Sequence, residues 1–375
     1  MTAVHQLLPV LSPGDAIGNA TLRTQAILRG LGHRSDIYAE VVDQALDARA
    51  KRIRELDLSS IDADDIVLYR LSIGSHVARI FELLPARKVI VFHNITPPQY
   101  YENVSPAVTH WLLRGEADLG RLAPQAELLI ADSAFNLAVA RRAGARSGVV
   151  IPPPVDFGRL HPRPAIPGQP PQLLFVGRIA PNKRLEVLVR ALAVLRHGHG
   201  VHARLVVAGN ANDTAPYLDG LRRLGGDLGV DDGVRFTGGM VADAELGRLY
   251  ASSNVFVTAS EHEGLCVPIL EAMAFSLPVV ARAAAAVPET VGEAALLVDD
   301  EDPYVFAAAI ARAVFDGALR RRLIVSGHQR LRAFAEPRIA ELLAQALRDM
   351  SSAPLGTSTA QLPERSTTPA RPASS

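Results

Sequence analysis

The chain has 375 residues, 48% of them hydrophobic, and its 39 lysine and arginine residues balance 39 aspartate and glutamate residues. A chain of this length usually folds as two domains, and this hydrophobic content is ample for two cores. The balanced charge, with no long basic run interleaved with aromatic residues, argues against a nucleic-acid partner. The lone cysteine, Cys266, excludes an intramolecular disulfide and a multi-cysteine metal site.

The first fifteen residues lack the basic region and long apolar core of a secretory signal peptide, and no apolar run approaches about 18 residues. We therefore expect a cytoplasmic protein. Arg141, Arg142 and Arg146 could contact anionic lipid at the inner face of the membrane, which would make the protein peripheral there. A solvated helix end is the simpler explanation of these arginines.

Short hydrophobic runs alternate with helical patterns up to about residue 325, which is typical of α/β domains with parallel strands. In the first half we predict strands over 5–11, 65–71, 88–92 and 127–131, and helices over 20–31 and from an N-cap at Ser133 to Arg142. In the loop at 12–19, Gly14 and Gly18 would let a phosphate or sugar approach the backbone, and Asn19 could cap the helix. A tight turn without a ligand explains this loop almost as well.

Eight prolines between residues 151 and 171 indicate a stiff linker. The alternation then resumes, with predicted strands over 173–176, 204–208, 234–237, 254–258 and 278–281 and a helix over 183–196. We place the domains at 1–155 and 172–325, on either side of a linker at 156–171. A helix over 326–350 and a disordered tail over 351–375 follow.

The segment ASEHEGLCVPILEAMAFSLPVVA at 259–281 places Glu263 and Glu271 around a strand-to-helix junction. Pro268 is the expected first helical residue, which would put Glu271 in the first helical turn. The free N–H groups and the dipole of a helix N-terminus favour an anionic or hydroxyl-rich ligand. Alternatively, Glu271 only complements the dipole and Glu263 is a solvated loop charge.

A glycine and two cations follow the first strand of the second half, in the sequence VGRIAPNK at 176–183. Gly177 permits a turn, Arg178 offers a bidentate fork, and Lys183 offers a point charge near a helix start, a set that suits a diphosphate. An exposed loop with two solvated cations is the alternative, because neither a P-loop nor a complete GxGxxG is present.

His93 directly follows a predicted strand, so it should face the cleft, where a neutral imidazole could bind a sugar hydroxyl or assist proton movement. A structural or merely exposed histidine is the alternative. The acidic run at 62–65 precedes a strand and therefore belongs to the opposite edge, and 231–233 is likewise a turn. No histidine or carboxylate cluster has convincing metal-ligand spacing.

Together these segments resemble the retaining nucleotide-sugar glycosyltransferases of the GT-B fold marked by E-x7-E, the group 1 or family 4 type. The matching segments are GRIAPNK at 177–183, the strand ending in Gly209, VRFTG at 234–238, EHEGLCVPILEAMAFSLPVVA at 261–281 and VPE at 287–289. The first half is similar more loosely, through FHN at 92–94 and DSAFN at 132–136. The resemblance implies two doubly wound Rossmann-like domains facing across a cleft. The first would bind the acceptor and the second the donor, with the C-terminal helices packing back on the first domain.

The resemblance also assigns roles to single residues. Arg178 and Lys183 would bind the donor diphosphate, Glu271 the ribose, and Glu263 would lie against the donor sugar. His93 would contact the transferred sugar, so that the catalytic set is His93, Arg178, Lys183 and Glu263. The remaining donor-binding positions are Gly18, Gly177, Gly209, Gly264, Leu265 and Cys266, the last of which stands where the family more often has glycine.

The implied reaction transfers a hexosyl unit from a UDP- or GDP-sugar, with retention, to a glycan, lipid-linked or small-molecule acceptor. No cofactor or metal is expected, since the nucleotide-sugar is a substrate, and activity should persist in excess chelator. We expect Lys183→Ala to cripple turnover with only a modest change in stability. Another GT-B activity, such as a phosphorylase or nucleotide-sugar epimerase, and a non-catalytic sugar-nucleotide-binding partner subunit remain as alternatives.

Overall fold

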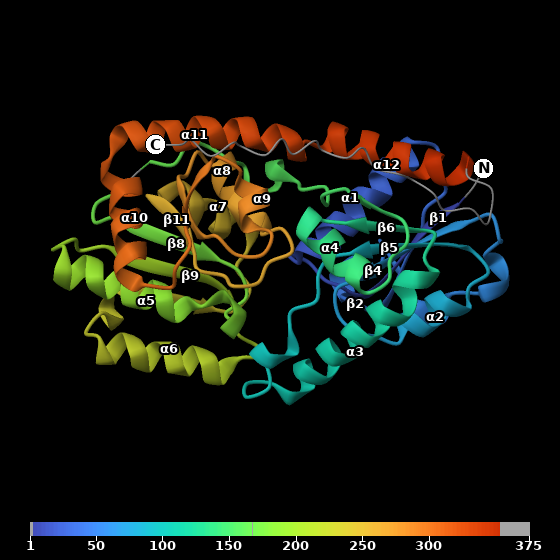
Figure 1. Cartoon of the computed structure of the whole chain (residues 1–375), viewed down its shortest axis with the longest axis horizontal. Coiled ribbons are helices and arrows are strands. Elements are labelled where there is room, and N and C mark those ends of the chain that lie inside the picture. Colours follow the sequence, from blue (N-terminus) through green and yellow to red (C-terminus); the bar gives the residue numbers. More distant parts are fainter. Residues whose placement is uncertain (1–2, 167, 353–375) are drawn as a thin grey trace, which may run out of the picture.

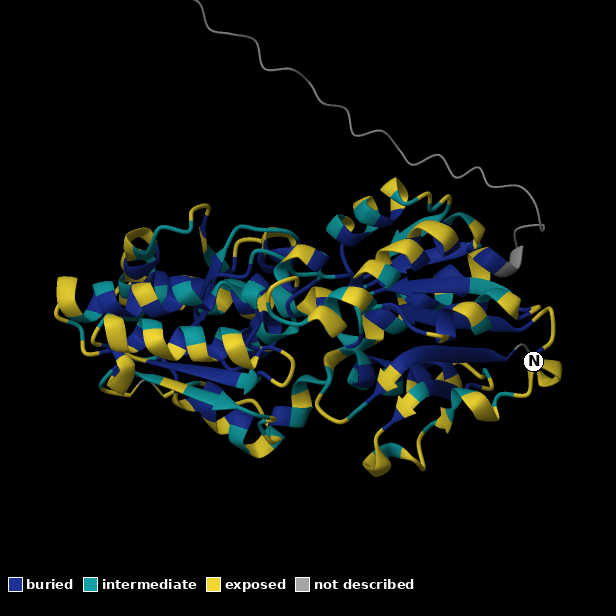
Figure 2. Ribbon diagram, turned by 90° about the horizontal axis from the view of Figure 1, so that it is seen from below, coloured by how far each residue is buried: buried dark blue, intermediate teal, exposed yellow. Residues whose placement is uncertain are grey.

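Two parallel β-sheets, each covered by helices, form two lobes that lie side by side (Figure 1). The structure, a computed structural model, describes residues 3–166 and 168–352. Buried residues follow the strands of both lobes, and exposed residues lie on the outer faces of the helices (Figure 2). The predicted α/β fold with two doubly wound domains is confirmed.

The first sheet has seven strands in the order β3-β2-β1-β4-β5-β6-β7, and its strand pairs are parallel. Leu7 of β1 pairs with Tyr38 on one side and Tyr69 on the other. The strands are apolar because helices cover both faces of a parallel sheet. Their bounds are Val4–Leu11 (β1), Ile37–Val42 (β2), Lys51–Arg52 (β3), Ile66–Leu71 (β4), Arg87–Phe92 (β5), Leu128–Ala131 (β6) and Gly148–Val150 (β7).

The second sheet has six parallel strands in the order β10-β9-β8-β11-β12-β13. The order reverses between β8 and β11, and ligands of such sheets bind beyond the strand ends at this reversal. The loops that follow β8 and β11 carry the two segments singled out in the sequence. The bounds are Gln172–Val176 (β8), Arg204–Asn210 (β9), Val234–Gly238 (β10), Val255–Thr258 (β11), Val279–Arg282 (β12) and Ala295–Val298 (β13).

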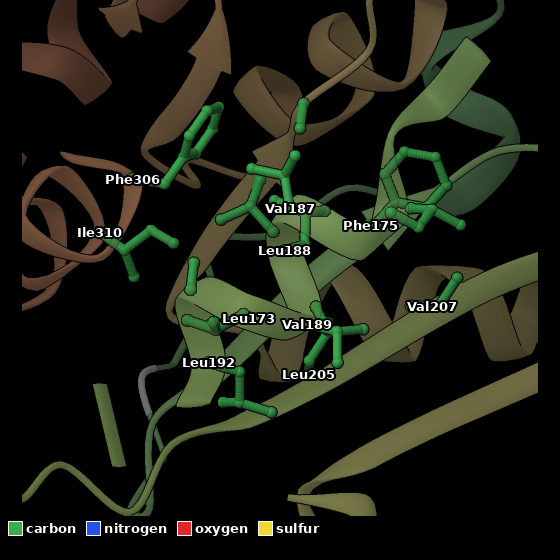
Figure 3. Close-up of a cluster of buried hydrophobic side chains, with 14 of the residues drawn as sticks. Leu173, Phe175, Val187, Leu188, Val189, Leu192, Leu205, Val207, Phe306 and Ile310 are labelled. Carbon is green, nitrogen blue, oxygen red and sulfur yellow. The ribbon is translucent and has the colours of Figure 1, made fainter. Parts of the chain in front are cut away.

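The core of the second lobe forms where helices press on its sheet. Leu188 and Leu192 of α5 (Leu185–Ala193) lie over Leu205 and Val207 of β9, and Phe306 of α10 (Pro303–Phe315) closes the cluster (Figure 3). All five side chains are almost fully buried. Full burial of one such side chain contributes about 1.5 to 3 kcal/mol, so this core stabilises the platform on which the loops after β8 and β11 stand.

Two helices of the first lobe begin at its cleft edge. α4 (Ala134–Arg142) has the predicted N-cap, because the Ser133 hydroxyl accepts from the Asn136 N–H. α1 (Ala16–Gly30) begins four residues before the predicted start, and its N-cap is Asp15, whose carboxylate accepts from the Gly18 N–H at 2.8 Å. Asn19 therefore lies inside α1 and does not cap it. The remaining helices of this lobe are α2 (Val77–Leu83) and α3 (Pro106–Leu122).

The last helices cross from the second lobe to the first along one side of the molecule (Figure 1). α11 (Gly317–Leu331) lies on α8 (Val267–Ala274), and α12 (Glu336–Ser352) lies on the first lobe. Ile339, Leu343 and Leu347 of α12 join a buried cluster with Val4 and Ile27. The prediction that the C-terminal helices pack back on the first domain is confirmed. The single helix expected over 326–350 is instead divided, because a 3-10 turn at Arg332–Phe334 separates α11 from α12.

The proline-rich segment between the sheets contains a 3-10 turn at Phe157–Leu160. Its later part is attached to the second lobe, because the N–H groups of Ala165 and Ile166 donate to the Phe275 and Ala251 carbonyls. The other helices of that lobe are α6 (Ala215–Asp227), α7 (Asp243–Ser252) and α9 (Val287–Val291). The first two residues of the tail predicted over 351–375 belong to α12, and the rest of that tail lies outside the described residues.

Candidate functional site

A cavity of about 390 Å³ lies between the lobes. The loop after β1 lines it from the first lobe, the connecting segment contributes residues 153–156 and Arg159, and the ends of β8 and β9 with α8 form the wall of the second lobe. Among the predicted site residues, those that line this cavity are Gly177, Arg178, Gly209 and Glu271. Its volume is within the usual range of small-molecule sites, about 300 to 1,000 Å³.

The two glycines of this wall allow neighbouring strand ends to approach each other closely. A Cβ atom on Gly209 would lie 1.9 Å from the Gly177 carbonyl oxygen, so no side chain fits there. The Gly177 N–H donates to the Ala208 carbonyl at 3.0 Å, which holds the end of β8 against β9. The wall consequently presents bare backbone, which a ligand can approach without meeting side chains.

Arg178 is exposed on the same wall, and no carboxylate lies within salt-bridge distance of it in the part of the chain that the structure describes. An unpaired guanidinium beside a bare backbone edge is suited to an anionic ligand with two oxygens. The role predicted for Arg178 in binding a donor diphosphate stays a prediction.

Lys183 is placed differently from Arg178. It ends a 3-10 turn at Pro181–Lys183, does not line the cavity, and donates from Nζ to Glu263 Oε1 at 2.7 Å. The two side chains are only 17% and 12% exposed. Burial is the largest single effect and opposes the ammonium, but the charge and hydrogen bond of Glu263, together with smaller neighbouring contributions, raise the pKa of Lys183. One predicted cation thus lines the cavity, whereas the other is held behind it in a largely buried ion pair.

Glu271 lines the cavity from α8 and is held from both sides. Arg159 Nη2 donates to its Oε1 at 2.7 Å and the Tyr250 hydroxyl donates to its Oε2 at 2.9 Å. Burial raises the pKa of Glu271 despite the neighbouring guanidinium. The expected position in the first helical turn is wrong. Cys266, with φ of 70°, is the N-cap, so α8 begins at Val267 and Glu271 lies in the second turn.

Sequence reasoning missed Arg159, which reaches the cavity from the linker turn and pairs with both Glu271 and Asp243. Asp243 also lines the cavity. The only signal in the sequence was an arginine inside a segment otherwise dominated by prolines. Because both partners are distant in sequence, that signal could not show what Arg159 contacts.

The lobes touch along a seam beside the cavity, formed by residues 93–94 and 133–136 of the first lobe and 262–264 and 289 of the second. A Cβ atom on Gly264 would lie 3.0 Å from the His93 carbonyl oxygen and 2.9 Å from the Asn94 Cβ. His262 Nε2 lies 2.9 Å from Asn94 Oδ1. Leu265 and Cys266, also predicted to bind the donor, are buried behind the seam and do not line the cavity.

Glu289 joins the second lobe to the N-terminus of α4 at the same seam. Its carboxylate accepts from the Ala134 N–H at 2.8 Å and from the Phe135 N–H at 3.3 Å. Ser133 already satisfies the next free donor of that helix. The second lobe therefore completes the capping of a first-lobe helix.

His93 follows β5 as predicted, but its ring is enclosed. Nδ1 lies 2.9 Å from Asp132 Oδ2, Nε2 lies 2.9 Å from Arg70 Nη1, and the side chain is only 2% exposed. Both ring nitrogens already have partners. The imidazole was predicted to contact a sugar hydroxyl or to assist proton movement. In this structure neither ring nitrogen is free to do so.

Arg70 was also missed by sequence reasoning, although a charged residue inside the apolar run of β4 is a signal of a buried polar contact. Burial lowers the pKa of Arg70 to about 10, with the Asp132 carboxylate opposing that effect. Gly18 is a further correction, because it lies in the first turn of α1 and does not line the cavity.

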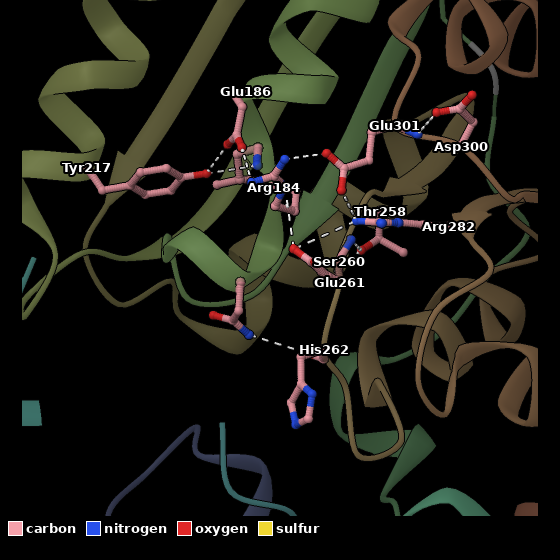
Figure 4. Close-up of polar contacts among 12 residues, drawn as sticks. Arg184, Glu186, Tyr217, Thr258, Ser260, Glu261, His262, Arg282, Asp300 and Glu301 are labelled. Atoms are coloured by element: carbon pink, nitrogen blue, oxygen red, sulfur yellow. Dashed lines mark hydrogen bonds and ion pairs between the residues drawn. The ribbon is translucent and has the colours of Figure 1, made fainter. Parts of the chain in front are cut away.

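A second polar cluster fixes the two loops that carry Lys183 and Glu263. Arg184 contacts Glu261 and Glu301, and Arg282 at the end of β12 contacts the same two carboxylates (Figure 4). Tyr217 of α6 donates to Glu186 and accepts from the Leu185 N–H, which ties the start of α5 to this group. Arg184 and Glu261 stand one and two residues from the buried pair, so the cluster determines where that pair lies.

The other acidic segments behave as turns. Asp65 accepts from the N–H groups of Ala3 and Asp62 before β4, and residues 231–233 form a 3-10 turn before β10. Within 3–166 and 168–352, no group of three or more histidine, cysteine, aspartate or glutamate side chains could hold a metal ion. Nor does any helix in these ranges have the length and apolar character needed to cross a membrane.

Comparison of the sequence with protein families finds a match that includes the second-lobe residues of this site. Residues 170–316 match the family model described as Glycosyl transferases group 1. The second domain is a group 1 glycosyl transferase domain. The glycosyl transferase domain contains the ends of β8 and β9, Arg178, the Lys183–Glu263 pair and Glu271, so the resemblance recognised in the sequence is confirmed.

Two relatives are similar over about half of the chain. The chain is 34% identical over 195 residues to a GDP-mannose-dependent alpha-(1-6)-phosphatidylinositol monomannoside mannosyltransferase of Mycobacterium tuberculosis, covering 47% of this chain and 48% of that protein. It is 36% identical over 191 residues to a D-inositol 3-phosphate glycosyltransferase of Acidothermus cellulolyticus, covering 47% and 42%. The chain therefore spans about half the length of the curated relatives it matches.

Solved structures are similar over nearly the whole chain. Sucrose-phosphate synthase from Thermosynechococcus elongatus has a TM-score of 0.72 at 19% identity, covering 94% of this chain and all of that one. Anabaena Alr3699/HepE in complex with UDP and glucose has a TM-score of 0.68 at 18% identity, covering 93% and 100%. At these identities the likeness establishes the fold, which is GT-B, around the glycosyl transferase domain and the lobe that faces it.

Proposed function

We propose that the chain is a retaining, metal-independent glycosyltransferase. It moves a hexosyl unit from a UDP- or GDP-sugar to a glycan, lipid-linked or small-molecule acceptor. The observation that carries this proposal is the interlobe cavity, where an unpaired guanidinium, a bare backbone wall and the held carboxylate of Glu271 meet. These groups suit the diphosphate and the ribose of one ligand.

The diphosphate is placed against Arg178 and the glycine wall. Departure of a nucleoside diphosphate from the sugar builds negative charge on phosphate, so fixed cationic donors act most strongly in the transition state. Lys183 donates to Glu263 from behind the cavity wall, so its positive charge supports the diphosphate from there. Holding Lys183 in place in advance avoids reorganisation during the reaction.

The ribose is placed at Glu271. Each carboxylate oxygen can accept a second hydrogen bond, so Glu271 can accept from ribose hydroxyls while Arg159 and Tyr250 keep its orientation. Arg159 therefore joins the proposed donor site as a positioning residue. Loss of Arg159 should weaken the binding of nucleotides that contain ribose.

The names of one relative and one structural neighbour suggest which donors to test first. One relative is named for GDP-mannose, and one neighbour was solved with UDP and glucose. Both nucleotides therefore belong in the first donor panel. A lipid-linked acceptor belongs in the acceptor panel because the same relative is named for a phosphatidylinositol mannoside.

The first experiment is thermal unfolding with UDP, GDP and their hexose conjugates. A ligand that binds only the folded state raises its apparent stability, by about 2.7 kcal/mol at a hundred times Kd. We expect stabilisation by one nucleotide family and loss of it in Arg178→Gln. The exposed Arg222→Gln on α6 is the matched control. If neither nucleotide family stabilises the chain at millimolar concentration, the donor site is wrong.

Turnover separates the rival functions. A transferase releases nucleoside diphosphate in proportion to added acceptor, with the product anomer matching the donor, in buffer with or without EDTA. A phosphorylase would need inorganic phosphate, an epimerase would release no diphosphate, and a partner subunit would bind donor without turnover. Metal-reversible loss of activity in EDTA would contradict metal independence.

A further inference from the structure

The imidazole of His93 lies inside a network that reaches across the first lobe. Arg70, in the middle of the buried strand β4, is only 2% exposed. Its Nη2 donates to Gln6 Oε1 at 2.9 Å and to Thr24 Oγ1 at 2.7 Å, and its Nε donates to the same Gln6 oxygen at 3.1 Å. Its Nη1 is left for His93. The buried guanidinium is thus held by β1 and α1 and directed at one nitrogen of one histidine.

Hydrogen-bond chemistry fixes the tautomer of that histidine. A guanidinium has only donors, so His93 Nε2 must accept from Arg70. The ring proton then lies on Nδ1, which is 2.9 and 3.0 Å from the two oxygens of Asp132. A neutral imidazole therefore connects a buried cation to a largely buried carboxylate, and neither ring nitrogen is free for a ligand.

The same network lies directly before a strained piece of backbone. Asn94 has a φ of 74°, in the left-handed region that residues other than glycine seldom adopt. Its side chain contacts His262, and the preceding carbonyl, that of His93, lies against Gly264. Such backbone persists only where the surroundings hold it, and the enclosed ring of His93 belongs to the residue directly before Asn94.

We infer that Arg70 and Asp132 are positioning residues that clamp His93 as its Nδ1–H tautomer, so that its backbone carbonyl, and not its ring, faces the lobe seam. This inference rests on the proposed function only in its catalytic consequence, which is that donor turnover depends on a seam held in place by this carbonyl. The clamp itself is a property of the folded chain.

The test begins with the tautomer. The full chain is labelled with 15N-histidine, and the ring-nitrogen spectrum is recorded at pH 7, with His93→Gln identifying the signals. We expect a single form of His93 with its proton on Nδ1. Arg70→Met removes the donor to Nε2, so a proton should appear on that nitrogen. Asp132→Ala keeps the Arg70 donor and should therefore leave the proton on Nδ1; it covers the case in which Arg70→Met does not fold, and a proton on Nε2 in this variant would overturn the inference. Arg79→Met, at an exposed arginine of α2, is the matched control and should leave the spectrum unchanged.

Kinetics then test the consequence. A displacement of about 1 Å caused by a substitution away from the reacting atoms can cost on the order of 10²-fold in rate, so kcat for donor turnover should fall by that order in Arg70→Met. The Kd for the bare nucleoside diphosphate should not change, because Arg178 and Glu271 belong to the other lobe. A wild-type ring with its proton on Nε2, or folded variants with wild-type kcat, would overturn the inference. If neither wild type nor any variant turns over a donor, the proposed function fails. The 15N spectrum then tests by itself whether Arg70 and Asp132 clamp His93.

Discussion

The Lys183–Glu263 pair shows how one contact changes the expected effect of a substitution. As a loop cation, Lys183 could be removed with little change in stability, which is what its sequence suggests. In the structure it is largely buried against a carboxylate on a loop that follows a different strand. Removing the ammonium leaves that carboxylate without its partner, so catalysis and stability become coupled at this residue.

We therefore expect Lys183→Ala to lower turnover by about 10² to 10³ and to lower the free energy of unfolding by about 3 to 5 kcal/mol. Denaturant unfolding and donor turnover, measured on the same preparation, check both numbers. The double variant Lys183→Met with Glu263→Gln removes both charges and should regain most of the stability but not the turnover. Near-normal transfer by Lys183→Ala would exclude the catalytic role.

At the scale of elements, α4 depends on the other lobe for part of its capping. Ser133 comes from its own chain segment, but Glu289 comes from α9 of the second lobe. Carboxylates at exposed helix N-termini typically contribute about 0.3 to 1 kcal/mol. Because this interaction exists only while the lobes touch, it favours the closed arrangement over an open one.

Glu289→Gln should reduce the closed population without affecting the fold of either lobe. A loss of about 0.5 to 1 kcal/mol corresponds to a roughly two- to fivefold shift toward the open form. A fluorophore pair with one dye on each lobe, read without ligand, measures this shift. Glu293→Gln, at an exposed glutamate just after α9, is the control and should leave the distance distribution unchanged. An unchanged distribution in Glu289→Gln would show that the contact does not stabilise closure.

α12 links the ends of the chain, because a C-terminal helix covers the sheet of the N-terminal lobe. Leu343 is 5% exposed and lies in the cluster that includes Val4 and Ile27. Leu343→Ala should cost about 2 to 5 kcal/mol, the usual range for a buried leucine, and lower the melting temperature accordingly. The exposed Glu341→Ala on the same helix is the comparison. A loss below about 1 kcal/mol would show that α12 is dispensable for the first lobe.

The whole molecule has a seam that responds to pH through His262. Burial lowers the pKa of His262 from its ordinary value of 6.5, although the adjacent Glu263 opposes this. The native state therefore binds fewer protons than the unfolded state as pH falls through 6.5. Stability contributed by the neutral ring is complete above that value and is lost as pH falls toward the lower native pKa.

We expect wild type to lose stability faster than His262→Gln between pH 6.5 and 5. One proton can steepen the dependence by at most about 1.4 kcal/mol per pH unit. Urea unfolding at several pH values gives the slope for each form. His5 also has a lowered pKa, mainly from burial, but its contribution is present in both proteins and cancels in the comparison. Equal slopes of unfolding free energy against pH in the two proteins would mean that protonation of His262 does not affect stability.

The fold could be predicted largely from local patterns. Apolar runs such as 173–176 and 204–208 indicate parallel strands because their side chains must be apolar on both faces of the sheet. Ser133 fixed a helix start because its capping bond spans only three residues. The start of α1 differs from the prediction because Asp15 and Asn19 are both local capping candidates, and it is Asp15 that accepts from the Gly18 N–H. The start of α8 depends on the left-handed backbone of Cys266. The sequence did not indicate this conformation, because residues other than glycine seldom adopt it.

The sequence by itself determined the strands, the glycines at their ends and the charged residues available for an anionic ligand, since these follow from short-range chemistry. Only the tertiary structure decided how those residues are paired. Arg178 faces the cavity while Lys183 is bound to Glu263, Arg159 reaches Glu271 from the linker, and Arg70 and Asp132 enclose His93. These partners come from strands and loops far apart in the chain, so no local pattern records which side chains meet.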